Sequence, residues 1–149
     1  MDGRTHFAGG IVSCLVTSIV IMLYQWNFSV ISLLFAGIFG GLFALYPDLD
    51  LKLHVGHRNA WLHSAFIPGI ILFLIICILI TSPNECNIAT RNFMISFGIY
   101  FASAFGSHLV LDCPQGDVVG MKKWGKLFLF VNGIVLFVAG ILTGIFLLI

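Results

Sequence analysis

Five long apolar runs, separated by short polar segments, account for most of the chain. They cover roughly residues 7–26, 28–46, 63–81, 93–111 and 127–149. Each run approaches or reaches the ~20 residues that an α-helix needs to cross the hydrocarbon core of a bilayer. The pattern predicts an all-α fold, a polytopic membrane helix bundle with about five transmembrane helices, in which residues 1–149 form a single integral membrane domain.

The composition excludes a water-soluble globule. Hydrophobic residues make up 60% of the 149 residues and charged residues only 9%, whereas soluble domains are about 45–50% apolar and about 25% charged. The lipid bilayer is therefore the expected partner of the chain. A net charge of +1 provides no basic surface for a phosphate backbone, so we expect no nucleic-acid partner.

The loops at the two ends of the predicted bundle differ in charge. Side A comprises the N-terminus and the segments 47–62 and 112–126, and side B comprises the segment 82–92 and the turn near Trp26. Side A holds six of the seven Lys and Arg residues, and side B holds only Arg91. The positive-inside rule predicts that the N-terminus and side A face the cytoplasm and that the C-terminus lies outside.

Small residues recur at four-residue spacing in three of the runs. They are Gly37 and Gly41, then Gly98, Ala102 and Gly106, and finally Gly140 and Gly144. Small side chains let helix backbones approach closely in lipid, where burial of apolar surface does not drive association. We interpret these positions as packing faces.

Nearly all side chains that can bind a metal lie on side A or within a turn of it. This holds for all five histidines and for five of the six acidic residues. In chain order the main candidates are His6, Asp48, Asp50, His54, His57, His63, His108, Asp112 and Asp117. We expect His54, beside Lys52, to be solvated and Asp117 to belong to a turn. Because four helix ends deliver the others to one face, a shared site is predicted.

The spacing of these residues suits a metal site. His108 and Asp112 are four residues apart and project from one face of a helix. In an extended segment Asp48 and Asp50 share a side, so either can bind a metal while the other orients a ligand. Imidazole with carboxylate favours Zn²⁺, with Mn²⁺ a second option. The predicted ligands are His6, Asp48, Asp50, His63, His108 and Asp112, with Asp112 as a candidate bridge between two ions.

These motifs resemble the YdjM-like family of inner-membrane, metal-dependent hydrolases. The matching elements are His6, Pro47-Asp48-Leu49-Asp50, His57-Arg58, His63-Ser64 and Ser107-His108-Leu109-Val110-Leu111-Asp112. The family is distantly similar to zinc-dependent phospholipase C and single-strand nucleases. That resemblance implies one or two ions, with Asp48 or Asp50, His63, His108 and Asp112 on the first and His6 on the second.

The leading functional hypothesis is a hydrolase that cleaves a phosphoester, such as a phospholipid, at the cytoplasmic face of the inner membrane. Arg58 would neutralise phosphate charge, His57 would act as a general acid or a further ligand, and Asp50 would take part in catalysis. Amide or ester hydrolysis is an alternative chemistry. Two other classes stay open: a membrane scaffold with a structural metal and a small transporter, for which Asn132 is the most polar group deep in a run.

Overall fold

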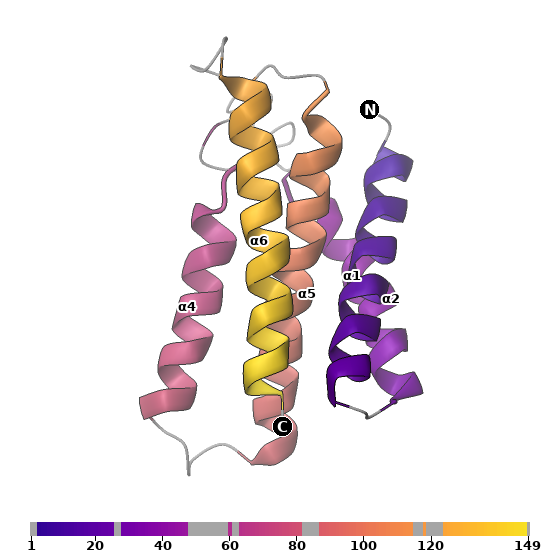
Figure 1. The fold of residues 1–149 in the computed structure, drawn as a ribbon, viewed down its shortest axis with the longest axis vertical. Coiled ribbons are helices and arrows are strands. Elements are labelled where there is room, and N and C mark those ends of the chain that lie inside the picture. Colours follow the sequence, from indigo (N-terminus) through magenta and orange to yellow (C-terminus); the bar gives the residue numbers. More distant parts are fainter. Residues whose placement is uncertain are drawn as a thin grey trace.

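The computed structural model describes residues 3–25, 28–47, 60, 63–81, 87–114, 118 and 124–148. Five helices are found in these ranges: α1 (Gly3–Gln25), α2 (Val30–Ala44), α4 (Phe66–Thr81), α5 (Ile88–Asp112) and α6 (Gly125–Leu147). The described residues contain no strand. The helices run side by side along the long axis of the molecule (Figure 1), so the predicted all-α bundle is confirmed.

The five helices differ in length. Three are long and apolar enough to span a membrane, namely Arg4–Gln25, Ile88–Asp112 and Gly125–Leu147. The other two, α2 and α4, are shorter apolar helices of 15 and 16 residues. At 1.5 Å per residue they extend about 22 and 24 Å. Within the described residues, the sequence prediction is therefore right about the number and order of the helices, and it overestimates the lengths of these two.

Local hydrogen bonds explain why α2 and α4 begin later than their apolar runs. The Ser29 hydroxyl accepts a hydrogen bond from the Ser32 amide at 3.3 Å and starts α2 at Val30, as expected for a serine N-cap. Residues 63–65 form a turn, and the Ser64 hydroxyl accepts from the Phe66 amide at 3.3 Å. These polar contacts hold both segments outside the helices although their neighbours are apolar.

Helix α5 is the centre of the bundle and contacts each of the other four helices. Close packing depends on glycine where backbones meet: a Cβ at Gly106 would lie 2.6 Å from the Gly133 carbonyl oxygen, and one at Gly10 would clash with the Gly40 carbonyl oxygen. The predicted packing role is confirmed for Gly106. Around Gly37, in contrast, no atom of the described residues lies within 4 Å of an added Cβ, so the described helices do not show the packing contact predicted there.

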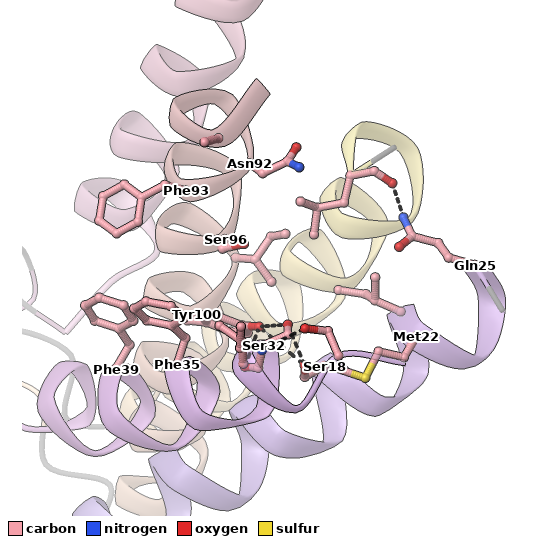
Figure 2. Close-up of a pocket in the computed structure, with 16 residues that line it drawn as sticks. Ser18, Met22, Gln25, Ser32, Phe35, Phe39, Asn92, Phe93, Ser96 and Tyr100 are labelled. Atoms are coloured by element: carbon pink, nitrogen blue, oxygen red, sulfur yellow. Dashed lines mark hydrogen bonds between the residues drawn. The ribbon is translucent and has the colours of Figure 1, made fainter. Parts of the chain in front are cut away.

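Serine, threonine and tyrosine hydroxyls connect α5 to α1 and α2 inside the bundle. The Thr17 hydroxyl donates to the Ser103 hydroxyl at 3.1 Å. Toward side B, the hydroxyls of Ser18, Ser32 and Tyr100 lie 2.9–3.3 Å apart (Figure 2). Such bonds between helices satisfy polar groups that lipid cannot hydrogen-bond. The polar side chains deep in these spans therefore hold helices together.

Candidate metal centre

Three histidines and one aspartate meet at the end of the bundle that holds the N-terminus (Figure 1). His6 lies in the first turn of α1, His63 in the turn before α4, and His108 and Asp112 in the last turns of α5. We call these four residues the His/Asp cluster. Each is at most 2% exposed, so the cluster is removed from bulk water.

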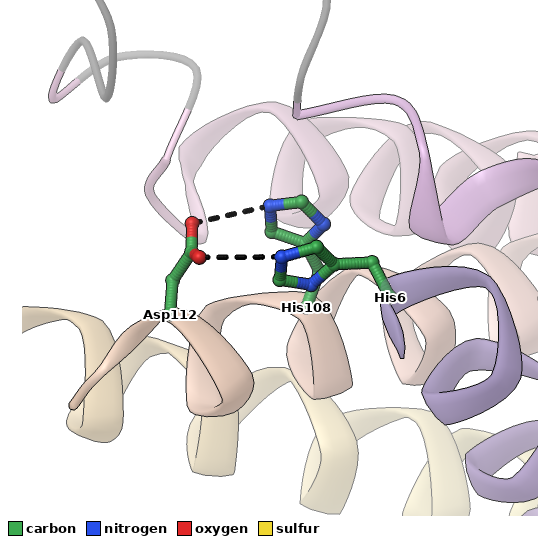
Figure 3. A group of neighbouring side chains, drawn as sticks. All are labelled: His6, His108 and Asp112. Carbon is green, nitrogen blue, oxygen red and sulfur yellow. Dashed lines mark ion pairs between the residues drawn. The ribbon is translucent and has the colours of Figure 1, made fainter. Parts of the chain in front are cut away.

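Asp112 is the centre of the cluster. Its Oδ1 lies 3.3 Å from His6 Nε2, and its Oδ2 lies 3.3 Å from His108 Nε2 and 3.5 Å from His63 Nε2. Figure 3 shows His6 and His108 approaching different oxygens of the carboxylate. The His6 and His108 rings stack with centroids 4.0 Å apart. Each oxygen of the carboxylate thus lies near an imidazole, and the two imidazoles come from different helices.

The end of α2 fixes the orientation of the His108 ring. His108 Nδ1 lies 2.6 Å from the carbonyl oxygen of Ala44, the last residue of α2. Because a carbonyl can only accept, Nδ1 carries the hydrogen, and a neutral His108 ring directs the Nε2 lone pair at Asp112. The contact also satisfies a carbonyl that the end of the helix leaves without an intrahelical partner.

The position of His63 depends on α6. The Ala65 amide, two residues beyond His63, donates to Asn132 Oδ1 at 2.9 Å, and Asn132 Nδ2 donates to the Phe128 carbonyl at 2.8 Å. One amide side chain therefore anchors the turn that carries His63 against a neighbouring helix. Since α6 is otherwise strongly apolar, this is a specific polar connection.

The distances in the cluster are compatible with a shared metal ion. Charge-assisted N–H···O bonds are normally about 2.7–2.9 Å long, whereas the three N···O distances here are 3.3–3.5 Å. Two ligand atoms each about 2.1 Å from a tetrahedral zinc ion lie about 3.4 Å apart. Donor atoms of His6, His108 and Asp112 all lie within 4.8 Å of one another, so the donor set fits a divalent ion.

The location of Asp112 also calls for a nearby positive charge. Asp112 is the last residue of α5, a helix of 25 residues. Unpaired carbonyls give a helix C-terminus a partial negative charge, which disfavours an adjacent carboxylate. Burial removes the water that would otherwise solvate it. A cation held between the carboxylate and the imidazoles would relieve both effects.

The structure brings together four of the predicted ligands, His6, His63, His108 and Asp112, from positions up to 106 residues apart in the sequence. The remaining candidates lie outside the described residues: Asp48, Asp50, His57 and Arg58, together with the two residues expected to be uninvolved, His54 and Asp117. Their predicted roles stay predictions.

Two contributors were missed by the sequence interpretation. The Ala44 carbonyl carries no side-chain signal and cannot be found without the fold. The sequence interpretation mentions Asn132 only as a polar group that a transporter would need. An amide isolated within an apolar run is also the signal of a contact between helices. In the structure Asn132 positions the His63 turn.

An apolar helix bundle with a buried His/Asp centre at one end defines the class: an integral membrane protein with a candidate metal site. A sequence model of the YdjM inner membrane protein family matches residues 1–121, and the chain belongs to that family. The match includes all four cluster residues and makes the bilayer the environment of the helices. No curated protein and no solved structure matches the chain.

Proposed function

We propose that the chain is a membrane-embedded, metal-dependent hydrolase that cleaves a phosphoester in a phospholipid. The observation that carries this proposal is the arrangement around Asp112, whose two oxygens face imidazole nitrogens at 3.3–3.5 Å in a buried site. The imidazole and carboxylate donors are those of catalytic zinc sites, and Mn²⁺ is also compatible with them.

The two oxygens of the Asp112 carboxylate face different histidines, an arrangement that is compatible with one or two bound ions. Oδ1 is directed at His6, whereas Oδ2 is directed at His108 and His63. Asp112, His63 and His108 would hold a first ion and His6 would help to hold a second, while the Ala44 carbonyl keeps His108 in the tautomer that can bind a metal. Bound divalent ions of this kind lower the pKa of water and neutralise charge on a phosphoryl group.

Three further residues belong to the proposed mechanism on sequence grounds. Asp50, or Asp48 in its place, completes the ligands of the first ion. Arg58 binds phosphate oxygens through its planar guanidinium, and His57 donates a proton to the leaving oxygen. The sequence places all of them on side A, between His63 and Pro47, which is buried three residues beyond the end of α2.

A groove beside the cluster supports a lipid as the substrate. It encloses about 580 Å³ between α1, α5 and α6, and small or apolar residues such as Ala8, Val12 and Ile134 line most of it. Its lining also includes the residues that directly precede three of the cluster residues in sequence, namely Thr5, Ser107 and Leu111. An acyl chain lying in this groove would hold its phosphoester near Asp112.

The test is phospholipid hydrolysis by the full-length protein in zinc-loaded lipid nanodiscs. Release of the phosphorylated head group is followed by phosphorus NMR for the wild type and for Asp112→Asn. We expect Asp112→Asn to lower the rate by more than about 100-fold, beyond the 10–100-fold typical of residues that only support a metal ligand. His54→Ala, a histidine outside the predicted site, is the matched control and should retain the rate.

Two results would contradict the proposal, and the first of them requires the metal content of the wild type to be measured as well. If the wild type binds zinc with these ligands but releases no head group, the hydrolase proposal is wrong and the ion is structural, as in a membrane scaffold. If Asp112→Asn and the wild type release head group equally, the activity does not belong to the His/Asp cluster.

A further inference from the structure

A second site lies at the end of the bundle opposite the His/Asp cluster. A cavity of about 480 Å³ is enclosed by the last turns of α1, the first turns of α2 and α5, and Leu148 after α6. This volume is within the range of cavities that hold small ligands or lipid head groups, about 300–1,000 Å³. We call it the side-B cavity, since the sequence assigns these helix ends to side B.

Hydroxyl groups form the base of the side-B cavity. The Tyr100 hydroxyl lies 2.9 Å from Ser32 Oγ and 3.3 Å from Ser18 Oγ, and it donates to the Ser32 carbonyl at 3.2 Å. Ser18 and Tyr100 are only 2–3% exposed. Each hydroxyl oxygen has two lone pairs, so this group retains capacity to accept hydrogen bonds from a ligand above it (Figure 2).

One wall of the cavity is a polar stripe on α5. Asn92, Ser96 and Tyr100 are spaced by four residues and line the cavity together. Neither Asn92 nor Ser96 has a hydrogen-bonded side chain within the described part of the chain, although both are partly buried. Figure 2 shows Asn92 projecting from α5 toward the side of the cavity where Gln25 lies. These amide and hydroxyl groups can therefore hydrogen-bond with a ligand in the cavity.

The rest of the lining is apolar and uncharged. Phe35, Phe39 and Phe93 contribute aromatic surface, and none of the described residues that line the cavity is charged. A phosphate would be buried here without a cation, which is strongly unfavourable. A molecule with hydroxyl or carbonyl oxygens and an apolar body would satisfy both parts of the lining.

We propose that the side-B cavity binds the head group of an uncharged lipid, a glyceride with free hydroxyl or ester carbonyl groups and no phosphate. The head group would hydrogen-bond with Tyr100 and Asn92, on either side of Ser96, and the first part of its chain would contact the phenylalanine rings. This site is separate from the His/Asp cluster and does not depend on hydrolysis there.

The test is protection of a cysteine placed in the cavity. Ser96→Cys is introduced into the full chain with Cys14, Cys77, Cys86 and Cys113 replaced by alanine, and its labelling by a water-soluble maleimide is timed in phosphatidylcholine nanodiscs. Mono-oleoylglycerol at about ten times its dissociation constant should slow labelling about tenfold. Phosphatidylglycerol at the same fraction and glycerol in the buffer should leave the rate unchanged. Thr90→Cys, on the exposed start of α5 outside the cavity, controls for general access.

A second variant separates specific binding from simple filling by hydrocarbon. Tyr100→Phe removes one hydroxyl and keeps the ring, and it should abolish the protection of the cysteine at position 96, whereas Tyr24→Phe at an exposed tyrosine should not. Equal slowing by the neutral and the anionic lipid overturns the proposal, as does protection by glycerol alone. Failure of the cysteine to label in plain phosphatidylcholine also overturns it, because the cavity would then be closed.

Discussion

Asp112 is the residue on which the account depends. It is 2% exposed, lies at the C-terminal end of α5, and faces three imidazoles from three parts of the chain. In the His108 tautomer whose Nδ1–H is donated to Ala44, the Nε2 atom offers Asp112 a lone pair rather than a hydrogen. Two lone pairs 3.3 Å apart repel unless a cation lies between them. A divalent ion, which the donor atoms of the cluster could hold, would remove this repulsion.

The first prediction concerns the charge of Asp112. Zinc should raise the melting temperature of the wild type, because an ion that binds only the folded protein stabilises it by about 4 kcal/mol at a thousand times its dissociation constant. Asp112→Asn should lose that increment, since an amide oxygen is a much weaker zinc ligand. The measurement is thermal unfolding in detergent with zinc and with a chelator.

The same substitution in the following loop provides the control. Asp117→Asn should keep the full zinc-dependent rise in melting temperature. An equal rise in Asp112→Asn and in the wild type would mean that the carboxylate at position 112 is not a ligand.

At the scale of elements, α6 supports the cluster without contributing a ligand from its described residues. Asn132 accepts a hydrogen bond from the Ala65 amide at 2.9 Å and donates one to Phe128 in its own helix. Its side chain is therefore fixed at both ends, and the turn carrying His63 is held at a defined distance from α5. We infer that α6 determines the position of His63 through this amide.

The prediction for Asn132 separates positioning from folding. Asn132→Leu should lower zinc affinity about 10–100-fold, the range seen when a group that orients a ligand is removed, and should leave the melting temperature of the zinc-free protein within a few degrees of wild type. Affinity is measured by competition with a chromophoric chelator. Thr143→Leu, a polar-to-leucine change elsewhere in α6, should affect neither quantity. A large loss of zinc-free stability with unchanged affinity would show that Asn132 is only a packing residue.

The helices could be predicted because their cause is local in sequence. Apolar runs of about 20 residues have to form helices in lipid, where each backbone group needs an internal partner. The ends of the helices are harder to predict. Ser29 and Ser64 set where α2 and α4 begin through hydrogen bonds that the hydropathy pattern does not show. Helix α5 also begins earlier than its apolar run predicts. It starts at Ile88, five residues before Phe93, because the Asn87 side chain caps it by accepting from the Thr90 amide at 2.7 Å.

Part of the site could be predicted for a similar reason. His108 and Asp112 share a helix face, and the topology brings the ends bearing His6 and His63 to the same side of the bundle. The pairing of each histidine with a particular oxygen of Asp112 depends on how the helices pack in three dimensions. The Gly10–Gly40 contact, which joins α1 to α2, is one such packing feature that the four-residue spacing did not reveal.

Over the whole molecule, polarity is distributed in the opposite way to that of a soluble protein. Val12, Ile80 and Phe146 are 60–71% exposed, whereas the buried set includes three histidines, an aspartate and several hydroxyl residues. Large apolar side chains on the outside suit hydrocarbon, and polar groups inside find partners across helices. The fold therefore needs a bilayer or a detergent to be stable.

The two ends of the bundle carry different chemistry. The end with the N-terminus holds the acidic and imidazole groups of the His/Asp cluster, and the other end holds the uncharged hydroxyl and amide groups of the side-B cavity. Helix α5 contributes to both, with Asn92 near its start, Tyr100 at its middle, and His108 and Asp112 near its end. The proposed metal site and the proposed site for a neutral ligand therefore lie at opposite ends of the bundle and would be independent.

The measurement that tests the central claim most directly is the metal content of the purified protein. Elemental mass spectrometry of wild type prepared in detergent without chelator should find one or two equivalents of Zn²⁺ or Mn²⁺ per chain. His108→Ala should lose the metal, and His54→Ala should retain it. A wild type without metal, or equal metal in His108→Ala and wild type, would contradict the assignment of the His/Asp cluster as a metal centre.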